Sequence, residues 1–291
     1  MSRHLAVILV LLLPAACRVE EVRTPPQTDD PAAVSAPETA LDVDTGPALA
    51  REGNSFVLPY GARTVYAGAD PGLATEVERL FLLLEDLRAE SVEISGNTEL
   101  PIGWTTLTFT VEGEAGERLV VREPDYDGDP EEATRADISV SLAVLARQRA
   151  VLERVNVAGE AIDFDEHVLT IAGSLDIDEV LLLRVPSPGG RLTGWRLAPT
   201  AGIKEEDALE SLPVHVILRR RPALLDAMLL PPGYIVYFAG DQMTTILDPD
   251  DVVVWDWRDG DQGSRPRSPE HPGDAPHTTP QRGPLLQPLG R

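Results

Sequence analysis

Acidic residues alternate along one stretch of the sequence and could bind a cation. In DYDGDPEEATRAD, Asp125, Asp127 and Asp129 stand at the first, third and fifth positions of a calcium-binding loop. An EF-hand needs glycine at the sixth position and glutamate at the twelfth, where this chain has Pro130 and Ala136. The sequence therefore excludes an EF-hand. It favours a solvated acidic loop, with a weak surface calcium site as the alternative.

The sequence gives little indication of a metal site at histidine or of a catalytic serine. His167 follows the acids Asp163, Asp165 and Glu166, which is no recognisable zinc pattern, and His215 lies in an apolar stretch. No Gly-x-Ser-x-Gly occurs, and PSPGGRLTG lacks the Lys-Ser/Thr of a phosphate loop and indicates a β-turn connection. We predict no catalytic residue, no metal and no cofactor. Hydrolysis by unrecognised carboxylates is the alternative.

The single cysteine follows an apolar N-terminal stretch. In MSRHLAVILVLLLPAAC, Arg3 precedes the apolar run Leu5–Leu13, which is too short to span a membrane and is typical of a signal peptide. The ending resembles the bacterial lipoprotein signal, although Pro14 replaces the usual leucine. That resemblance implies that Cys17 becomes the first mature residue and carries lipid, palmitate included. A secretory signal with an incidental cysteine is the alternative.

The resemblance to lipoproteins also predicts a location. Several lipid chains on one cysteine hold a protein firmly on a membrane. Arg18 follows the cysteine, which resembles the pattern of lipoproteins sorted to the outer membrane. We therefore expect the protein in the cell envelope, lipid-anchored to a membrane. In a cell with two membranes, this is the periplasmic face of the outer membrane.

Composition limits the partners that the protein can have. The 291-residue chain has a net charge of −23. The leader contributes +1, residues 18–52 contribute −5 and residues 256–291 contribute 0, which leaves −19 on residues 53–255. Such a body repels nucleic acid and anionic lipid. We predict no nucleic-acid partner, membrane contact only through lipid on Cys17, and a basic protein partner.

Two proline-rich segments flank the part of the chain that is expected to fold. Residues 18–52 are rich in proline, alanine, threonine and acids, which predicts a disordered tether after the signal peptide of residues 1–17. Residues 256–291 predict a disordered tail for the same reason. The 43% hydrophobic content suffices for a packed core between them.

The body between these segments shows both helical and strand patterns. Helices are predicted over Leu73–Arg88, over Ser139–Val155 and over a short Pro213–Arg221 that restarts or kinks at Pro222. Alternating or β-branched stretches predict strands at residues 62–68, 105–113, 118–124, 166–173, 178–185, 233–240 and 251–257.

Three features recur in the same order along the body. VLARQRAVLERV at 144–155 resembles ILRRRPALLDAM at 217–228, and TVYAG resembles LTIAG. The pair Gly103-Trp104 recurs as Gly194-Trp195. We therefore predict an α+β fold of two small, related, tandem modules with antiparallel sheets and packed helices, at residues 53–157 and 158–255. Chance similarity of amphipathic helices is the alternative.

Tryptophans are candidates for partner binding, because this residue is enriched at binding hot spots. We single out Trp195, Arg196 and Trp104, with burial of both rings in the core as the alternative. Trp255 and Trp257 alternate on the last predicted strand, which places both on one face.

Residues of about 158–250 resemble a small immunity-protein family of bacterial polymorphic-toxin loci. The resemblance is carried by Gly194, Trp195, Arg196, Pro222, Pro232 and Gly233. It implies an α+β module without known chemistry that neutralises a toxin by binding it. Our main hypothesis is a non-enzymatic, membrane-anchored binding lipoprotein with a basic or toxin-like partner. A structural component of an envelope complex, with the tail as docking peptide, and an envelope hydrolase are the alternatives.

Overall fold

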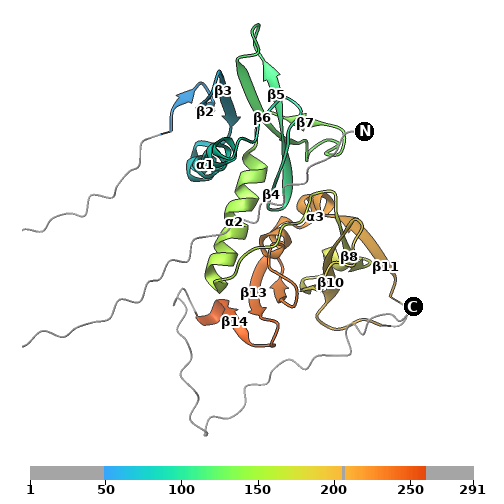
Figure 1. The fold of residues 1–291 in the computed structure, drawn as a ribbon. Coiled ribbons are helices and arrows are strands. Elements are labelled where there is room, and N and C mark those ends of the chain that lie inside the picture. The colour runs from blue at the N-terminus through green and yellow to red at the C-terminus, as the bar shows by residue number, and fades with distance from the viewer. Residues whose placement is uncertain (1–48, 205–206, 260–291) are drawn as a thin grey trace, which may run out of the picture.

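The protein has an α+β fold built on two seven-stranded sheets, which confirms the predicted class (Figure 1). The structure is a computed structural model and describes residues 49–204 and 207–259. The predicted signal peptide with Cys17 and most of the predicted tether and tail lie outside the described residues. The described fold begins with a strand at Arg51 and ends with a turn of helix at Asp259.

The first sheet has the strand order β1-β2-β3-β6-β5-β4, with β7 paired to β6. Strands β3 and β6 are parallel, and the other neighbours are antiparallel. Its strands are β1 (Arg51–Glu52), β2 (Ser55–Tyr60), β3 (Arg63–Gly68), β4 (Glu99–Ile102), β5 (Thr105–Glu112), β6 (Arg118–Pro124) and β7 (Thr134–Arg135).

The second sheet has the strand order β11-β8-β10-β9-β12-β13-β14. Strands β8 and β10 are parallel, and the other neighbours are antiparallel. Its strands are β8 (His167–Ile171), β9 (Glu179–Arg184), β10 (Leu192–Pro199), β11 (Leu209–Pro213), β12 (Ile235–Ala239), β13 (Gln242–Leu247) and β14 (Val253–Asp256).

Three α-helices accompany the sheets within the described residues: α1 (Ala74–Ala89), α2 (Ser139–Val155) and α3 (Val214–Arg220). Short 3-10 helices lie at Pro71–Leu73, Ser174–Asp176, Pro222–Ala227 and Trp257–Asp259. The predicted bounds of α2 are confirmed, and so is the break before Pro222. Helix α2 ends at Val155, because the next residue, Asn156, adopts a left-handed conformation (φ 53°) that stops the helix.

Helix α2 is shared by two hydrophobic cores. Ile138 and Leu142 at its start belong to the core of the first sheet, whereas Val144 and Val151 belong to that of the second. Leu145 contacts both cores. The two halves of the protein are therefore joined through one helix rather than by a linker (Figure 1).

The two sheets share a local arrangement that agrees with the sequence repeat only in part. In the first sheet, β6 lies between β3, to which it is parallel, and β5, to which it is antiparallel. In the second sheet, β10 lies in the same way between the parallel β8 and the antiparallel β9. The repeated helix segments, α2 and α3, follow these strands. The Gly-Trp pairs do not correspond, because Trp104 precedes β5 whereas Trp195 lies within β10. Duplication stays a prediction.

Two sequence predictions about the second half need correction. PSPGGRLTG is a turn only in its first part, because β10 begins at Leu192 and continues through Gly194. Strand β14 ends at Asp256, so Trp257 begins a 3-10 helix and does not continue the alternation with Trp255. None of the helices within the described residues is long and apolar enough to cross a membrane.

Candidate functional site

The tryptophans predicted to bind a partner are buried in the second core. Neither Trp104 nor Trp195 exposes its ring to solvent in this structure. Each indole N–H donates to a backbone carbonyl of a helical segment: that of Trp104 to Ser141 in the first turn of α2 at 3.3 Å, and that of Trp195 to Met228, which caps the 3-10 helix Pro222–Ala227, at 2.8 Å. These bonds satisfy the polar atom of a buried indole. Both rings hold helical segments in place, and a direct role in partner binding stays a prediction.

Arg196 is half-buried on β10, between β8 and β9. With His167 and Trp195 it lines a cavity of about 20 Å³. That volume is close to the space of a single water molecule. Arg196 therefore remains the accessible member of the predicted set, but it does not line the larger groove described next.

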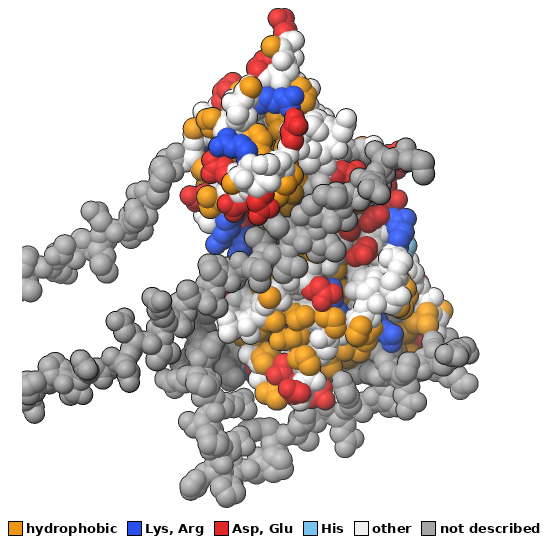
Figure 2. Space-filling model, viewed as in Figure 1, with side chains coloured by type: hydrophobic (Ala, Val, Ile, Leu, Met, Phe, Trp, Pro, Cys, Tyr) orange, Lys and Arg blue, Asp and Glu red, His pale blue; other side chains and the backbone are white. Residues whose placement is uncertain are grey.

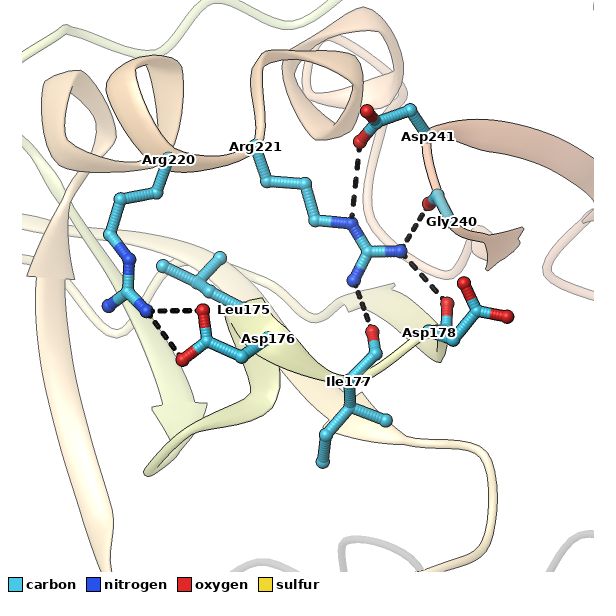
Figure 3. Close-up of a pocket in the computed structure, with 8 residues that line it drawn as sticks. All are labelled: Leu175, Asp176, Ile177, Asp178, Arg220, Arg221, Gly240 and Asp241. Atoms are coloured by element: carbon cyan, nitrogen blue, oxygen red, sulfur yellow. Dashed lines mark hydrogen bonds and ion pairs between the residues drawn. The ribbon is translucent and has the colours of Figure 1, made fainter.

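A groove of about 240 Å³ lies where the segment 175–178 just before β9, the end of α3 and the β12–β13 turn meet (Figure 3). Arg221, only 4% exposed, closes its base. Its guanidinium donates to the carbonyl of Ile177 at 2.6 Å, to that of Asp178 at 2.9 Å and to that of Gly240. This one side chain therefore ties the end of α3 to the backbone just before β9 and to the β12–β13 turn.

Charged side chains line the groove and leave it acidic. Arg220 makes two 2.8 Å hydrogen bonds to the carboxylate of Asp176, so that these charges offset each other. Arg221 Nε lies 3.8 Å from Asp241, and the Asp178 carboxylate adds a further negative charge (Figure 3). Three carboxylates face two guanidinium groups, a net charge of −1. Ile177, which also lines the groove, is 39% exposed.

The acidic loop after β6 is tied to the protein by arginines. Arg135 pairs with the fully buried Glu123 at 2.8 Å and with Asp127 at 2.7 Å. From α3, Arg219 donates to the carbonyls of Tyr126 and Gly128. No group of three or more potential metal ligands is found in the described parts of the chain.

The joint between the two sheets contains buried polar groups. The Tyr126 hydroxyl lies 2.5 Å from Thr105 Oγ1, and the Tyr126 ring stacks on Trp104 at 5.1 Å. Nearby, the Asp163 carboxylate accepts hydrogen bonds from Thr106 Oγ1 at 2.9 Å and from the Phe164 N–H at 2.7 Å.

Burial changes the ionisation of groups at this joint. It raises the pKa of Asp163 to about 6, despite the hydrogen bonds from Thr106 and Phe164. Burial also raises the pKa of Glu123, which the N–H of Ser141 and Arg135 oppose. Neither carboxyl lines the groove, so the shifted carboxyls and the open groove are separate features.

The two histidines of the folded body, His167 and His215, contact side chains of neighbouring strands and loops rather than lining the groove. His167 Nδ1 lies 3.0 Å from Ser211 Oγ across the β8–β11 pair. His215 is buried near the Phe164 ring, and burial and the charge of Arg219 lower its pKa. Its imidazole is therefore neutral at pH 7.

Residues 147–249 match the family model of the Imm33-like domain. The match begins within α2, covers β8 to β13 with the helices between them, and ends before β14. No curated protein and no solved structure gives a significant match to the chain. This segment is therefore similar to an immunity-protein-like family, which confirms the resemblance indicated by its motifs.

The motif residues of this resemblance support the fold. Gly194 (φ 84°) and Gly233 (φ 100°) adopt left-handed conformations, and a Cβ on Gly194 would lie 2.3 Å from the carbonyl oxygen of Val185. Pro222 begins the 3-10 helix after α3. The recognisable motif therefore marks the scaffold, whereas the groove is formed by residues outside it. The arginines Arg220 and Arg221 carry no sequence signal for this groove, because their partners Asp176 and Ile177 lie 44 residues away in the chain.

Proposed function

We propose that this protein is an immunity-like binding protein that recognises a protein partner without catalysing a reaction. The observation that carries the proposal is the match of residues 147–249 to the Imm33-like domain. That family resemblance supports a protein partner such as a toxin. The acidic groove at Arg220 and Arg221 supports a basic side chain of the partner as one contact.

The experiment is a pull-down with the full chain, extracted from its native envelope in mild detergent and incubated at low salt. We expect mass spectrometry to identify one dominant basic or toxin-like protein. Because opposite surface charges are screened by ions, its recovery should fall when salt is raised. Recovery that does not change with salt would contradict an electrostatic contribution to binding. If no protein is recovered above background, the proposed binding function is contradicted.

Variants of the groove test where the partner binds. Asp178→Asn with Asp241→Asn removes two negative charges and should weaken binding about tenfold, the loss expected for a pair of rim charges. Glu85→Gln with Glu93→Gln is the matched control, because it removes two exposed charges from the first half. Equal losses in the two double variants would assign the effect to net charge alone.

We further propose that the chain is anchored in the cell envelope through lipid on Cys17. The support is the apolar leader that ends in the only cysteine of the sequence. Cells grown with labelled palmitate should label the full chain, and Cys17→Ala should abolish both labelling and membrane association. A Cys17→Ala protein that still fractionates with membranes would contradict the anchor.

A further inference from the structure

Strand β14 lies at the edge of the second sheet. It pairs antiparallel with β13, and no other described strand lies beside it. An edge strand has N–H and C=O groups along its outer side that can pair with another extended chain. The Imm33-like match ends at residue 249, so β14 lies beyond the segment that carries the family resemblance.

The edge is unusually apolar. Val252, Val253, Val254 and Trp257 are 53%, 37%, 36% and 46% exposed. Edge strands are commonly protected from pairing by lysine, proline, an inward charge or a β-bulge. Val252–Val254 contains no lysine, proline or charge, and the register shift between Ile246 and Leu247 on β13, opposite Val253–Trp255, leaves the three valines exposed. Figure 2 shows apolar side chains gathered where Figure 1 places β13 and β14, with acidic side chains at the margin.

The strand is held firmly on its inner side. Trp255 packs against the second core, and the guanidinium of Arg154, at the end of α2, lies 4.9 Å from its ring centroid. Asp248 accepts the N–H groups of Asp250 and Val252, which orders the turn that leads into the strand. An ordered edge binds at a lower entropic cost than one that must first become ordered.

Charge decides which occupant the edge fits. Asp248, Asp250 and Asp251 stand before the strand, Asp256 stands at its end, and Arg258 and Asp259 follow. Five carboxylates and one guanidinium give residues 248–259 a net charge of −4, so the apolar stretch is bordered mainly by acidic groups. Antiparallel pairing of two copies would place Asp250 of one beside Asp256 of the other, and both copies carry a net charge of −23. A second copy is therefore disfavoured, whereas a segment with basic ends is favoured.

We propose that β14 binds an extended segment of the protein partner by strand addition, and that this segment has a β-branched centre with lysine or arginine at both ends. Main-chain hydrogen bonds would supply affinity, and the charged ends would set register. This inference rests on the proposed function, because the segment that binds β14 would belong to the same protein partner.

The probe is a synthetic peptide of alternating valine and threonine with two lysines at each end, added to the full chain at low salt. We expect binding by fluorescence anisotropy and slower hydrogen exchange of the amides at 252–256. Glutamate ends, or a central proline that removes a main-chain donor, should weaken binding at least about tenfold. Equal binding of all three peptides would overturn the inference.

Matched variants locate the site. Val254→Lys should weaken peptide binding at least about tenfold. Val111→Lys is the control, because Val111 is 42% exposed on β5 of the first sheet. Val252→Lys, at a more exposed position, tests the same edge should Val254→Lys lower the melting temperature. Equal binding by the edge variants and the control would overturn the inference.

Other occupants give distinct results. Protection of 252–256 without peptide that is lost on deletion of 260–291 would show that the chain's own tail occupies the edge. Dimers in sedimentation that Val254→Lys abolishes would show a second copy there. Either result overturns the inference. A natural partner that is captured equally by wild type and Val254→Lys overturns it but leaves the proposed function standing. Peptide binding without any captured partner contradicts only the proposed function.

Discussion

Asp163 shows how a single carboxyl can link the stability of this protein to pH. Its side chain is hydrogen-bonded to Thr106 on β5 and to the backbone of Phe164, so it fixes the chain between the two sheets. The same position is shielded from water, and Asp165 and Glu166 add negative charge nearby. Between pH 3.8 and about 6, the folded protein therefore retains a proton that the unfolded chain has released.

Asp163→Asn should flatten the pH dependence of stability. Burial raises the pKa of Asp163 from 3.8 to about 6, so the free energy of unfolding should fall as pH rises between these values. Asparagine preserves the shape and removes the charge, and should stabilise the protein at pH 7 by at most about 3 kcal/mol. Urea denaturation at several pH values measures this. Asp86→Asn, at an exposed site on α1, is the control. Parallel curves for Asp163→Asn and wild type would contradict the assignment.

Among the secondary-structure elements, α2 has the largest structural role. Its first turn is bound by the buried Glu123, which accepts the N–H of Ser141 at 2.7 Å. Further along, Gln148 donates to the carbonyl of Leu225 at 2.9 Å, and Arg147 pairs with Asp226 at 2.8 Å. One helix thus contacts structure from both halves of the chain.

Leu142→Ala tests whether the halves unfold together. Leu142 lies in the core of the first sheet, and its truncation should cost about 2–5 kcal/mol. Because α2 also belongs to the second core, hydrogen exchange of both sheets should accelerate in a single transition. Val151→Ala, in the second core, should give the same pattern. Two separate transitions would show that the halves are independent.

Elements with a clear period were predictable from sequence, and irregular ones were not. The 3.6-residue spacing identified α1 and α2, and alternation identified the β5–β6 hairpin. Strands β2 and β4 escaped notice because each contains a proline, Pro59 or Pro101, a residue uncommon within sheets. The glycines before β10 obscured its start for a similar reason.

The groove could not be predicted, because its residues meet only after folding. Arg221 and its carbonyl partner Ile177 are 44 residues apart. Backbone carbonyls carry no sequence signature, so no motif marks such a clamp. Trp104 and Trp195 were conspicuous in sequence, but the structure places both rings in the core.

For the whole molecule, charge is the dominant property. A net charge of −23 opposes compactness through self-repulsion, while it favours encounter with a basic partner. Added salt should therefore stabilise the compact fold and weaken the attraction of a basic partner.

Sodium chloride should raise the melting temperature and weaken partner binding. Screening of repulsion between carboxylates is expected to stabilise the fold by about 1 kcal/mol, which corresponds to about 2–4 °C for a chain of this size. Thermal scans of the full chain between low and high salt measure the shift. A falling melting temperature would mean that ion pairs such as Arg191–Asp165 outweigh the repulsion.

The position of α2 also has an evolutionary consequence. An exchange of segments between related genes yields a stable protein only where the junction leaves a foldable product. A junction at Arg147, where the family resemblance begins, would divide α2 and separate Leu142 from Val151. The heritable unit is therefore larger than the recognisable one. Lineages that carry this Imm33-like segment in the same context should inherit the preceding sheet with it.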